Sequence, residues 1–202
     1  MIGPRRTLGT LGVGLLFMGG LASPILAAGA PPVRVVSQGI SILVPPPWEN
    51  RTSLLARDPA LAREVEAGGP PPILYLTAPA VEFFLPNLVL QRAPTTVGDL
   101  APAQVLAVIH TELSHRIPKG DYRVTARLPV RVGGYPATGE ELRGSLSGPV
   151  AGHTLTVAVR GQLFYIDVRG RLYLLGFTVP QSLWGQYQGA WVTMLRSLRF
   201  GA

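Results

Sequence analysis

Residues 162–200, QLFYIDVRGRLYLLGFTVPQSLWGQYQGAWVTMLRSLRF, decide which fold this chain can adopt. The segments on either side of Arg169 and Gly170 are rich in aromatic and β-branched residues, which is typical of two antiparallel strands joined by a short turn. After this hairpin, apolar residues recur at steps of three and four, at Trp184, Tyr187, Trp191, Met194, Leu195 and Leu198. Such spacing forms one apolar stripe along a helix. The stretch therefore predicts a hairpin and the helix that covers it.

The composition indicates one folded domain without thiol chemistry. The 202 residues include 24 Gly, 20 Pro and no Cys, and only 14% of them are charged. The lack of Cys excludes disulfides, thiolate metal sites, Cys nucleophiles and a lipid-modified Cys. Low charge together with ample apolar residues is typical of a folded, loop-rich domain rather than of disorder.

The chain is basic, with 18 basic and 11 acidic residues. Subtracting Arg5 and Arg6, which lie in the leader described next, leaves 16 basic residues against 11 acidic ones, or a net charge of +5. All the basic residues except Lys119 are Arg. This charge permits attraction to anionic surfaces. No segment resembles a nucleic-acid-binding module, so we expect no nucleic-acid partner.

Residues 1–30 have the pattern of a secretory signal peptide. An arginine pair is followed by an uncharged run over 7–26 and then by small residues. Export signals have this order of basic start, apolar middle and small-residue end. We expect cleavage at about 27–30, export to the periplasm or beyond, and a single mature domain over 31–202. The alternative is an uncleaved membrane anchor, because the uncharged run is long enough to span a bilayer. The choice between the Sec and twin-arginine routes stays open.

The mature chain predicts strands and helices without an internal repeat. Asp58, followed by Pro59, is suited to cap and begin a short helix, and a longer helix is predicted to begin at Asp99. The sequence PPPW at 45–48 cannot continue a strand and predicts a rigid turn, with Trp48 at an edge of the core. We expect strands over 33–44, 73–77, 88–92, 122–132, 135–143 and 154–160, a long helix over 99–116, and a Gly/Ser-rich loop over 144–153.

Three patterns that carry chemistry in other proteins are incomplete here. His110 and His115 lie five residues apart, about 140° around a helix, whereas zinc-binding helices use a spacing of four. In the motif GSLSG, Leu146 occupies the place where a nucleophile elbow needs Ser. Glu140 and Glu141 are adjacent, so on a strand they point to opposite faces and cannot share a substrate. We therefore expect no enzyme, no metal site and no cofactor.

Two groups of residues are candidates for binding. Arg123, Arg127 and Arg131 lie on a strand whose residues alternate, so they are predicted to project from one face. This basic strand face is either a docking surface for an acidic partner or anionic lipid headgroups, or a face that is solvated or paired with carboxylates. Phe83 and Phe84 belong to an apolar loop that either covers the edge of the core or contacts a ligand.

Several segments together resemble the PsbP-like superfamily, including its bacterial DcrB-type secreted relatives. They are ISILVPPPW, NLVLQRAP and the helix after it, VGGYPATGEELRG, GRLYLLGFTVP and MLRSLRF, and they extend over about 39–200. The resemblance implies an α/β/α sandwich of the α+β class, with a mainly antiparallel sheet and helices on both faces. It also implies a domain that is not an enzyme and acts as an extrinsic subunit, assembly factor, small GTPase-binding protein or periplasmic accessory.

These observations predict an exported, non-enzymatic accessory domain that docks to a protein or complex of the cell envelope, and we expect a monomer. The alternative is a carrier of a lipid or other apolar ligand held between the covering helices and the sheet. It is motivated by the aromatic residues Phe83, Phe84, Trp184 and Trp191. A hydrolase is a third hypothesis, and it would need catalytic side chains that converge in a cleft.

Overall fold

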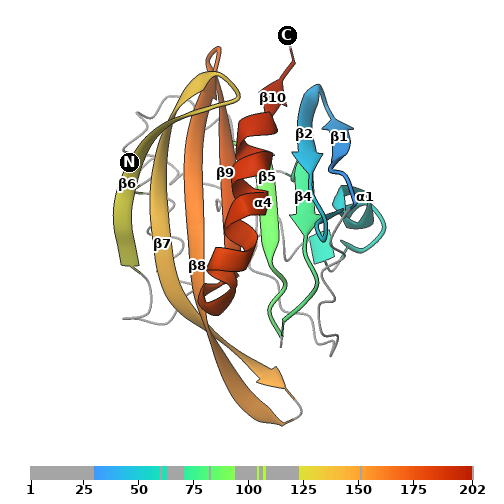
Figure 1. Ribbon diagram of the computed structural model, residues 1–202, viewed down its shortest axis with the longest axis vertical. Coiled ribbons are helices and arrows are strands. Elements are labelled where there is room, and N and C mark those ends of the chain that lie inside the picture. The colour runs from blue at the N-terminus through green and yellow to red at the C-terminus, as the bar shows by residue number, and fades with distance from the viewer. Residues whose placement is uncertain are drawn as a thin grey trace, which may run out of the picture.

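Two antiparallel sheets and a long helix make up the described part of the chain (Figure 1). The computed structural model describes residues 30–59, 61–62, 71–81, 83–93, 104, 107, 123–150 and 152–201. The larger sheet has seven strands in the order β3-β4-β5-β9-β8-β7-β6. These strands are β3 (Glu49–Asn50), β4 (Leu74–Thr77), β5 (Asn87–Arg92), β6 (Arg123–Val132), β7 (Tyr135–Val150), β8 (His153–Val168) and β9 (Arg171–Pro180).

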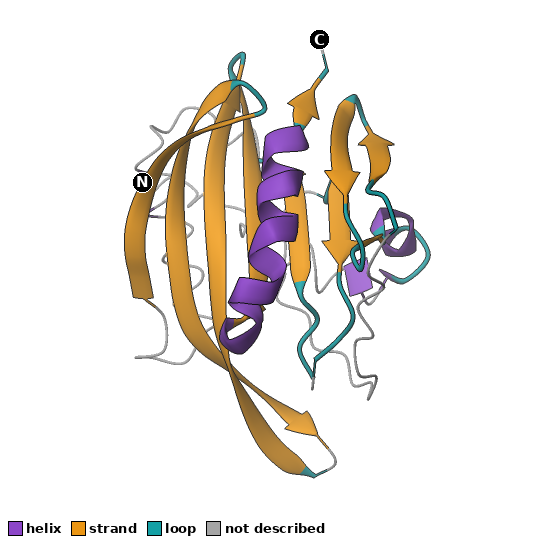
Figure 2. Ribbon diagram, viewed as in Figure 1, coloured by secondary structure: helices purple, strands orange, loops and turns teal. Residues whose placement is uncertain are grey.

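The predicted C-terminal hairpin and helix are both confirmed. β8 and β9 pair antiparallel, with Val168 opposite Arg171 across the turn Arg169-Gly170. A short 3₁₀ helix, η2 (Gln181–Leu183), leads into α4 (Trp184–Ser197), which lies along one face of the large sheet (Figure 2). The apolar stripe of α4 faces that sheet, since Trp184, Tyr187, Trp191, Met194 and Leu198 are all buried.

Aromatic rings fill the interface between α4 and the sheet. Trp191 stacks on Phe177 with 4.6 Å between ring centroids and on Phe164 with 5.9 Å. The indole Nε1 of Trp191 donates a 2.6 Å hydrogen bond to Gln162 Oε1, so the polar atom of this buried ring has a partner. Each buried ring contributes on the order of 2 kcal/mol through the apolar surface removed from water. The stripe therefore anchors the helix to the sheet.

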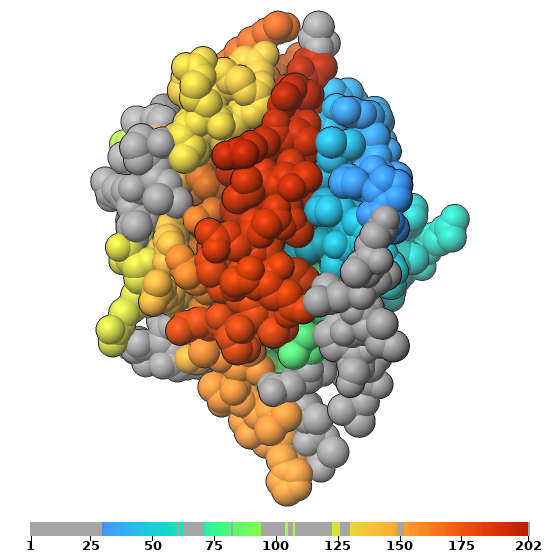
Figure 3. All heavy atoms as spheres, viewed as in Figure 1, coloured from blue at the N-terminus to red at the C-terminus, as the bar shows by residue number. Residues whose placement is uncertain are grey.

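The strand predicted over 33–44 is wrong, because the segment forms a hairpin. β1 (Val33–Ser37) and β2 (Ile40–Val44) pair antiparallel, and Gln38 and Gly39 form the turn with φ of 48° and 77°. β10 (Arg199–Phe200) pairs with β2 and completes a three-stranded sheet. The predicted apolar face of β2 is present, since Ile40, Ile42 and Val44 are buried. Figure 3 shows α4 crossing this face of the molecule between the hairpin β1-β2 and the turn between β6 and β7.

Helices lie on both faces of the large sheet, as the α/β/α sandwich implied by the resemblance requires. α1 (Thr52–Leu55) buries Leu55 against Tyr75 and Val89. These two residues point away from α4, because their neighbours Leu74 and Leu90 belong to the core beneath α4. Asp58 caps the following turn as predicted, with its Oδ1 accepting a 3.0 Å hydrogen bond from the backbone N–H of Leu61.

Three further predictions meet different outcomes. The strands predicted over 73–77 and 88–92 are confirmed as β4 and β5. The predicted Gly/Ser-rich loop over 144–153 is wrong, since 144–150 pair in register with 153–159 and extend β7 and β8 beyond the rest of the sheet (Figure 2). Of the helix predicted over 99–116, only Gln104 and Ala107 are among the described residues, and both are helical.

Within the described residues, no helix is both long and apolar enough to cross a membrane.

Candidate functional site

A β-bulge at Thr125 separates the three arginines predicted to share one face of β6. A bulge inserts one extra residue into a strand and so reverses the alternation of faces beyond it. Arg123 therefore lies on the face that α4 covers, whereas Arg127 and Arg131 occupy register positions of the opposite face. The prediction of a single basic strand face is wrong for this reason. The register pairs Arg123 with Arg143, Val124 with Leu142, Ala126 with Glu141, Arg127 with Glu140 and Arg131 with Pro136.

The face that carries Arg123 also holds a carboxylate with several donors. Glu141 accepts hydrogen bonds from Arg160 at 2.8 Å, from Arg143 at 3.2 Å and from the hydroxyl of Thr125 at 3.2 Å. Burial acts to raise the pKa of Glu141, but the hydrogen bonds from Arg160 and Arg143 and the charge of Arg160 outweigh it and hold the pKa below its ordinary value.

Arg160 also connects this ion cluster to the helix. Its guanidinium lies 4.0 Å from the centre of the Trp184 ring, at the first residue of α4, which is a cation–π geometry. Glu141, Arg143 and Arg160 thus join three strands to the start of the covering helix. All three charges are engaged within the fold, so we assign the cluster a structural role.

The two adjacent glutamates point to opposite faces, as predicted. Glu141 pairs with Gln162, whose side chain reaches α4, while Glu140 pairs with Leu163 on the other face and is fully buried. They cannot act on one substrate from these positions.

The apolar loop residues lie in the interior. Phe83 and Phe84 are 2% and 0% exposed, and Phe84 packs with Leu146 and Val159 at the base of the extended β7-β8 hairpin. This placement agrees with the alternative in which the loop covers the core, and not with the one in which it contacts a ligand. Trp184 and Trp191, the other rings behind the carrier hypothesis, pack against the sheet.

The residues weighed for catalysis are not assembled into a site within the described residues. His110 and His115 lie outside the described residues, and the third histidine of the chain, His153, is exposed at the start of β8. The motif GSLSG lies within β7, where the Ser147 hydroxyl makes a 2.7 Å hydrogen bond with Thr156. In the described part of the chain, no three His, Cys, Asp or Glu side chains come together as a metal site.

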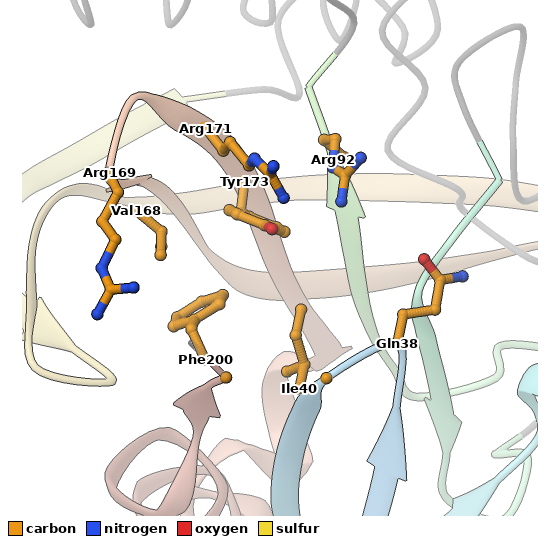
Figure 4. A pocket seen from close by; sticks show the side chains of 10 residues that line it. Gln38, Ile40, Arg92, Val168, Arg169, Arg171, Tyr173 and Phe200 are labelled. Atoms are coloured by element: carbon orange, nitrogen blue, oxygen red, sulfur yellow. The ribbon is translucent and has the colours of Figure 1, made fainter.

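A pocket at one end of the large sheet is the candidate functional site (Figure 4). It has a volume of about 320 Å³ and is formed where the β1-β2 turn, the end of β5, the β8-β9 turn and the end of β10 meet. Four apolar or aromatic side chains, three arginines and one glutamine contribute to it. The lining residues are Gln38, Gly39, Ile40, Arg92, Val168, Arg169, Arg171, Tyr173, Phe200 and Gly201.

The pocket carries positive charge without a balancing carboxylate. Arg92, Arg169 and Arg171 contribute guanidinium groups, and no Asp or Glu belongs to the lining. Among the described residues, none of these arginines forms an ion pair. Arg92 lies 5.9 Å from the centre of the Tyr173 ring, at the outer limit of a cation–π contact. Asp167, nearby in sequence, accepts a 2.7 Å hydrogen bond from the backbone N–H of Gly170 and so stabilises the turn.

Two of the lining residues have an unfavourable backbone conformation. Gln38 and Arg169 have φ of 48° and 56°, and each is followed by a glycine with φ of 77°. Positive φ at both central positions defines a type I′ hairpin turn, which favours Asn, Asp or Gly at the first of them. A long side chain in this left-handed region costs about 1 kcal/mol. In both hairpins, the residue at the first turn position therefore makes the turn less stable than Asn, Asp or Gly would.

Close backbone packing holds the floor of the pocket. The backbone N–H of Gly201 donates a 2.7 Å hydrogen bond to the carbonyl of Gly39, and a Cβ on Gly201 would lie 2.6 Å from that oxygen. The Phe200 ring packs edge-on against Tyr135, with 5.8 Å between centroids, and at 5.0 Å from Tyr173. These contacts tie β10 to the turn of one hairpin and to the strands of the large sheet.

No local pattern in the sequence predicts this pocket. Arg169 and Gly170 were predicted only as a turn, and Arg92 and Arg171 were given no role. The signal present in the sequence is the pair of turns Gln38-Gly39 and Arg169-Gly170, in which a long polar residue precedes Gly between two apolar strands.

Comparisons with known proteins show a likeness of fold. No family model matches the chain, and no curated protein matches it in sequence. Cyanobacterial PsbP (CyanoP) from Synechocystis sp. PCC 6803 matches with a TM-score of 0.51 and 14% identity, over 89% of this chain and 98% of that chain. The chain is thus an α+β protein in which helices cover an antiparallel sheet. More particularly, it has a PsbP-like fold, which confirms the resemblance at that level.

Two other solved structures are similar at lower TM-scores. LpqN, involved in cell envelope biogenesis of Mycobacterium tuberculosis, matches with a TM-score of 0.49 and 19% identity, over 87% of this chain and 88% of that chain. The Saccharomyces cerevisiae Ran-binding protein Mog1p also gives a TM-score of 0.49, with 12% identity over 84% of this chain and 96% of that chain.

Proposed function

We propose that this chain is an exported accessory domain, without catalytic activity of its own, that docks to a protein or complex of the cell envelope. We also propose that it belongs with the DcrB-type secreted members of the PsbP-like superfamily. The signal-peptide pattern over 1–30 supports export.

The observation that carries the docking proposal is the arginine-lined pocket. Three guanidinium groups surround a concave surface with no carboxylate in its lining. Elsewhere on the same sheet, Arg143 and Arg160 form ion pairs with Glu141. The pocket differs from that cluster because its lining contains no acidic partner for its arginines. Arginine is the side chain best suited to bind carboxylate or phosphate groups through two parallel hydrogen bonds. The pocket therefore supports recognition of an anionic group on a partner.

A localisation and capture experiment tests this proposal. The full chain with a C-terminal tag is produced in its own host, fractionated, cross-linked, and purified over a range of salt concentrations. We expect the mature protein outside the cytoplasmic membrane, together with an envelope protein that also binds the purified domain in solution. Retention in the cytoplasm contradicts export, and the absence of a binding envelope protein at every salt concentration contradicts docking.

A further inference from the structure

The two strained turn residues of this structure belong to the same cavity. Among the described residues, Gln38 and Arg169 are the non-glycine residues with positive φ, and both line the arginine pocket. Both turns are type I′, which accounts for the positive φ but not for a long side chain at the first position in place of Asn, Asp or Gly. Residues held in a disfavoured backbone conformation are found preferentially at functional sites. Their coincidence at one cavity indicates that their side chains are needed there.

The pocket presents charge around an apolar floor rather than at one point. Figure 4 shows Arg92 and Arg171 near the Tyr173 ring, while Arg169 extends past Val168 on another side and Gln38 stands at the far edge. Ile40 and Tyr173 are nearly buried, and the ring of Phe200 is half-buried. The volume of about 320 Å³ corresponds to roughly ten water molecules, which is more than a single small anion fills.

We infer that this pocket binds an acidic segment of a protein partner that presents carboxylates together with apolar side chains. This inference rests on the proposed docking function and names the chemistry of the partner. Two carboxylates of one segment can meet separate guanidiniums, because the pocket arginines come from the end of β5 and from the β8-β9 turn. An apolar side chain of the segment faces the floor at Ile40 and Phe200. Gln38 supplies amide groups for hydrogen bonds with the backbone of the segment.

A substitution at the turn residue Arg169 can distinguish a role in binding from a purely structural role. Asn tolerates the left-handed region better than Arg, because its short side chain hydrogen-bonds locally. Arg169→Asn is therefore expected to raise the melting temperature by about 2–4 °C while it weakens binding of the acidic segment. A residue that serves only the turn would show the gain in stability alone.

The experiment measures binding of two synthetic peptides to the purified mature domain by fluorescence anisotropy. One peptide alternates glutamate with phenylalanine, and the other has glutamine in place of each glutamate. We expect binding of the glutamate peptide only, weakening as salt is added. Arg92→Gln and Arg171→Gln should each reduce its affinity by about tenfold, which is the loss of one charge-assisted contact. Arg57→Gln, at an exposed position outside the pocket lining, should leave the affinity unchanged.

Competing occupants are separate arms of the same experiment. Vesicles of phosphatidylcholine with and without phosphatidylglycerol test a membrane surface, and inorganic phosphate tests a small anion. Equal affinity for both peptides overturns the inference. So does an equal loss of affinity in Arg57→Gln and Arg171→Gln, or pocket-dependent binding to the anionic vesicles without binding to the peptide. Arg169→Asn with higher stability and full affinity would also contradict the role given to that turn.

The outcome separates the inference from the proposed function. If the wild-type domain captures its envelope partner, and Arg92→Gln with Arg171→Gln captures it equally well, docking stands and the pocket is not the site. If the wild-type domain captures no partner, docking itself fails. Loss of capture in the double variant, with retention in Arg57→Gln, supports both.

Discussion

Arg143 and Arg160 surround the carboxylate of Glu141 beneath the start of α4, whereas Arg92, Arg169 and Arg171 surround a cavity with no carboxylate in its lining. Both groups lie on the large sheet or at its β8-β9 turn, and arginine is the charged side chain in each. In the first group, hydrogen bonds and ring stacking engage the guanidiniums within the fold. In the second, the described residues provide no ion pair.

The difference shows how arginines that stabilise a fold can be told from arginines that are available to a ligand. A charge that already has its partner gains little from a ligand, because the new contact must replace an existing one. A charge held at a concave surface without a counterion keeps its capacity to form a charge-assisted hydrogen bond. The arginines around Glu141 should therefore contribute more to the stability of the fold than the arginines of the pocket.

Glu141→Gln is expected to have the largest effect. The variant leaves Arg160 and Arg143 without their counterion beside α4, and the free energy of unfolding should fall by about 2 kcal/mol at neutral pH. Chemical denaturation measures the change. Glu49→Gln is the matched control, because the Arg51–Glu49 pair is exposed on both sides and should contribute less than about 0.5 kcal/mol. Equal effects of the two variants would remove the distinction between engaged and exposed charges.

The contribution of Glu141 should also depend on pH. Its pKa in the folded state lies below the ordinary value of 4.5, so its stabilisation is present above that value and is lost as the pH falls through the folded-state pKa. The stability difference between the wild type and Glu141→Gln should therefore shrink as the pH is lowered below 4.5. Denaturation of both proteins across the acidic range measures this. A constant difference over that range would contradict the assigned pairing.

The parts of the fold that the sequence predicts are those encoded by local pattern. The stripe on α4 and the hairpin at Arg169-Gly170 follow from residue spacing within a single stretch, and both are confirmed. The hairpin at Gln38-Gly39 was missed because Gly39 was its only turn signal, since Gln is not typical of the first position of a type I′ turn. The extension of β7 and β8 was missed because Gly and Ser disfavour strands unless a paired strand holds them.

The candidate site depends on features that no single stretch contains. One bulge at Thr125 reverses the face of Arg123 relative to Arg127, and nothing in the alternation of β6 signals it. The pocket gathers residues from four segments, of which Gln38 and Gly201 are the most distant in sequence. Their meeting depends on strand register and on β10 pairing with β2. A single sequence does not specify these long-range pairings through periodicity.

Gly133→Ala should destabilise the protein by about 1–2 kcal/mol and disturb the pocket. Gly133 has φ of 60°, and a Cβ there would lie 2.7 Å from the ring of Phe200, which lines the cavity. Gly134→Ala is a matched control, because its φ is 91° and a Cβ would meet no atom within 4 Å. It carries the backbone strain without the contact. We expect weaker peptide binding in Gly133→Ala alone, and equal binding in the two variants would show that Phe200 is not part of the site.

The smallest effect on stability should come from neutralising an arginine of the pocket. Arg171→Gln removes a charge that has no ion pair among the described residues, so the free energy of unfolding should change by less than about 0.5 kcal/mol. Arg160→Gln makes the same substitution in the other group and should cost about 1 kcal/mol, because Glu141 and the Trp184 ring both lose a partner. Denaturation at low salt measures both variants. If Arg171→Gln costs as much as Arg160→Gln, the pocket arginines stabilise the fold, and the contrast between the two groups does not identify a binding site.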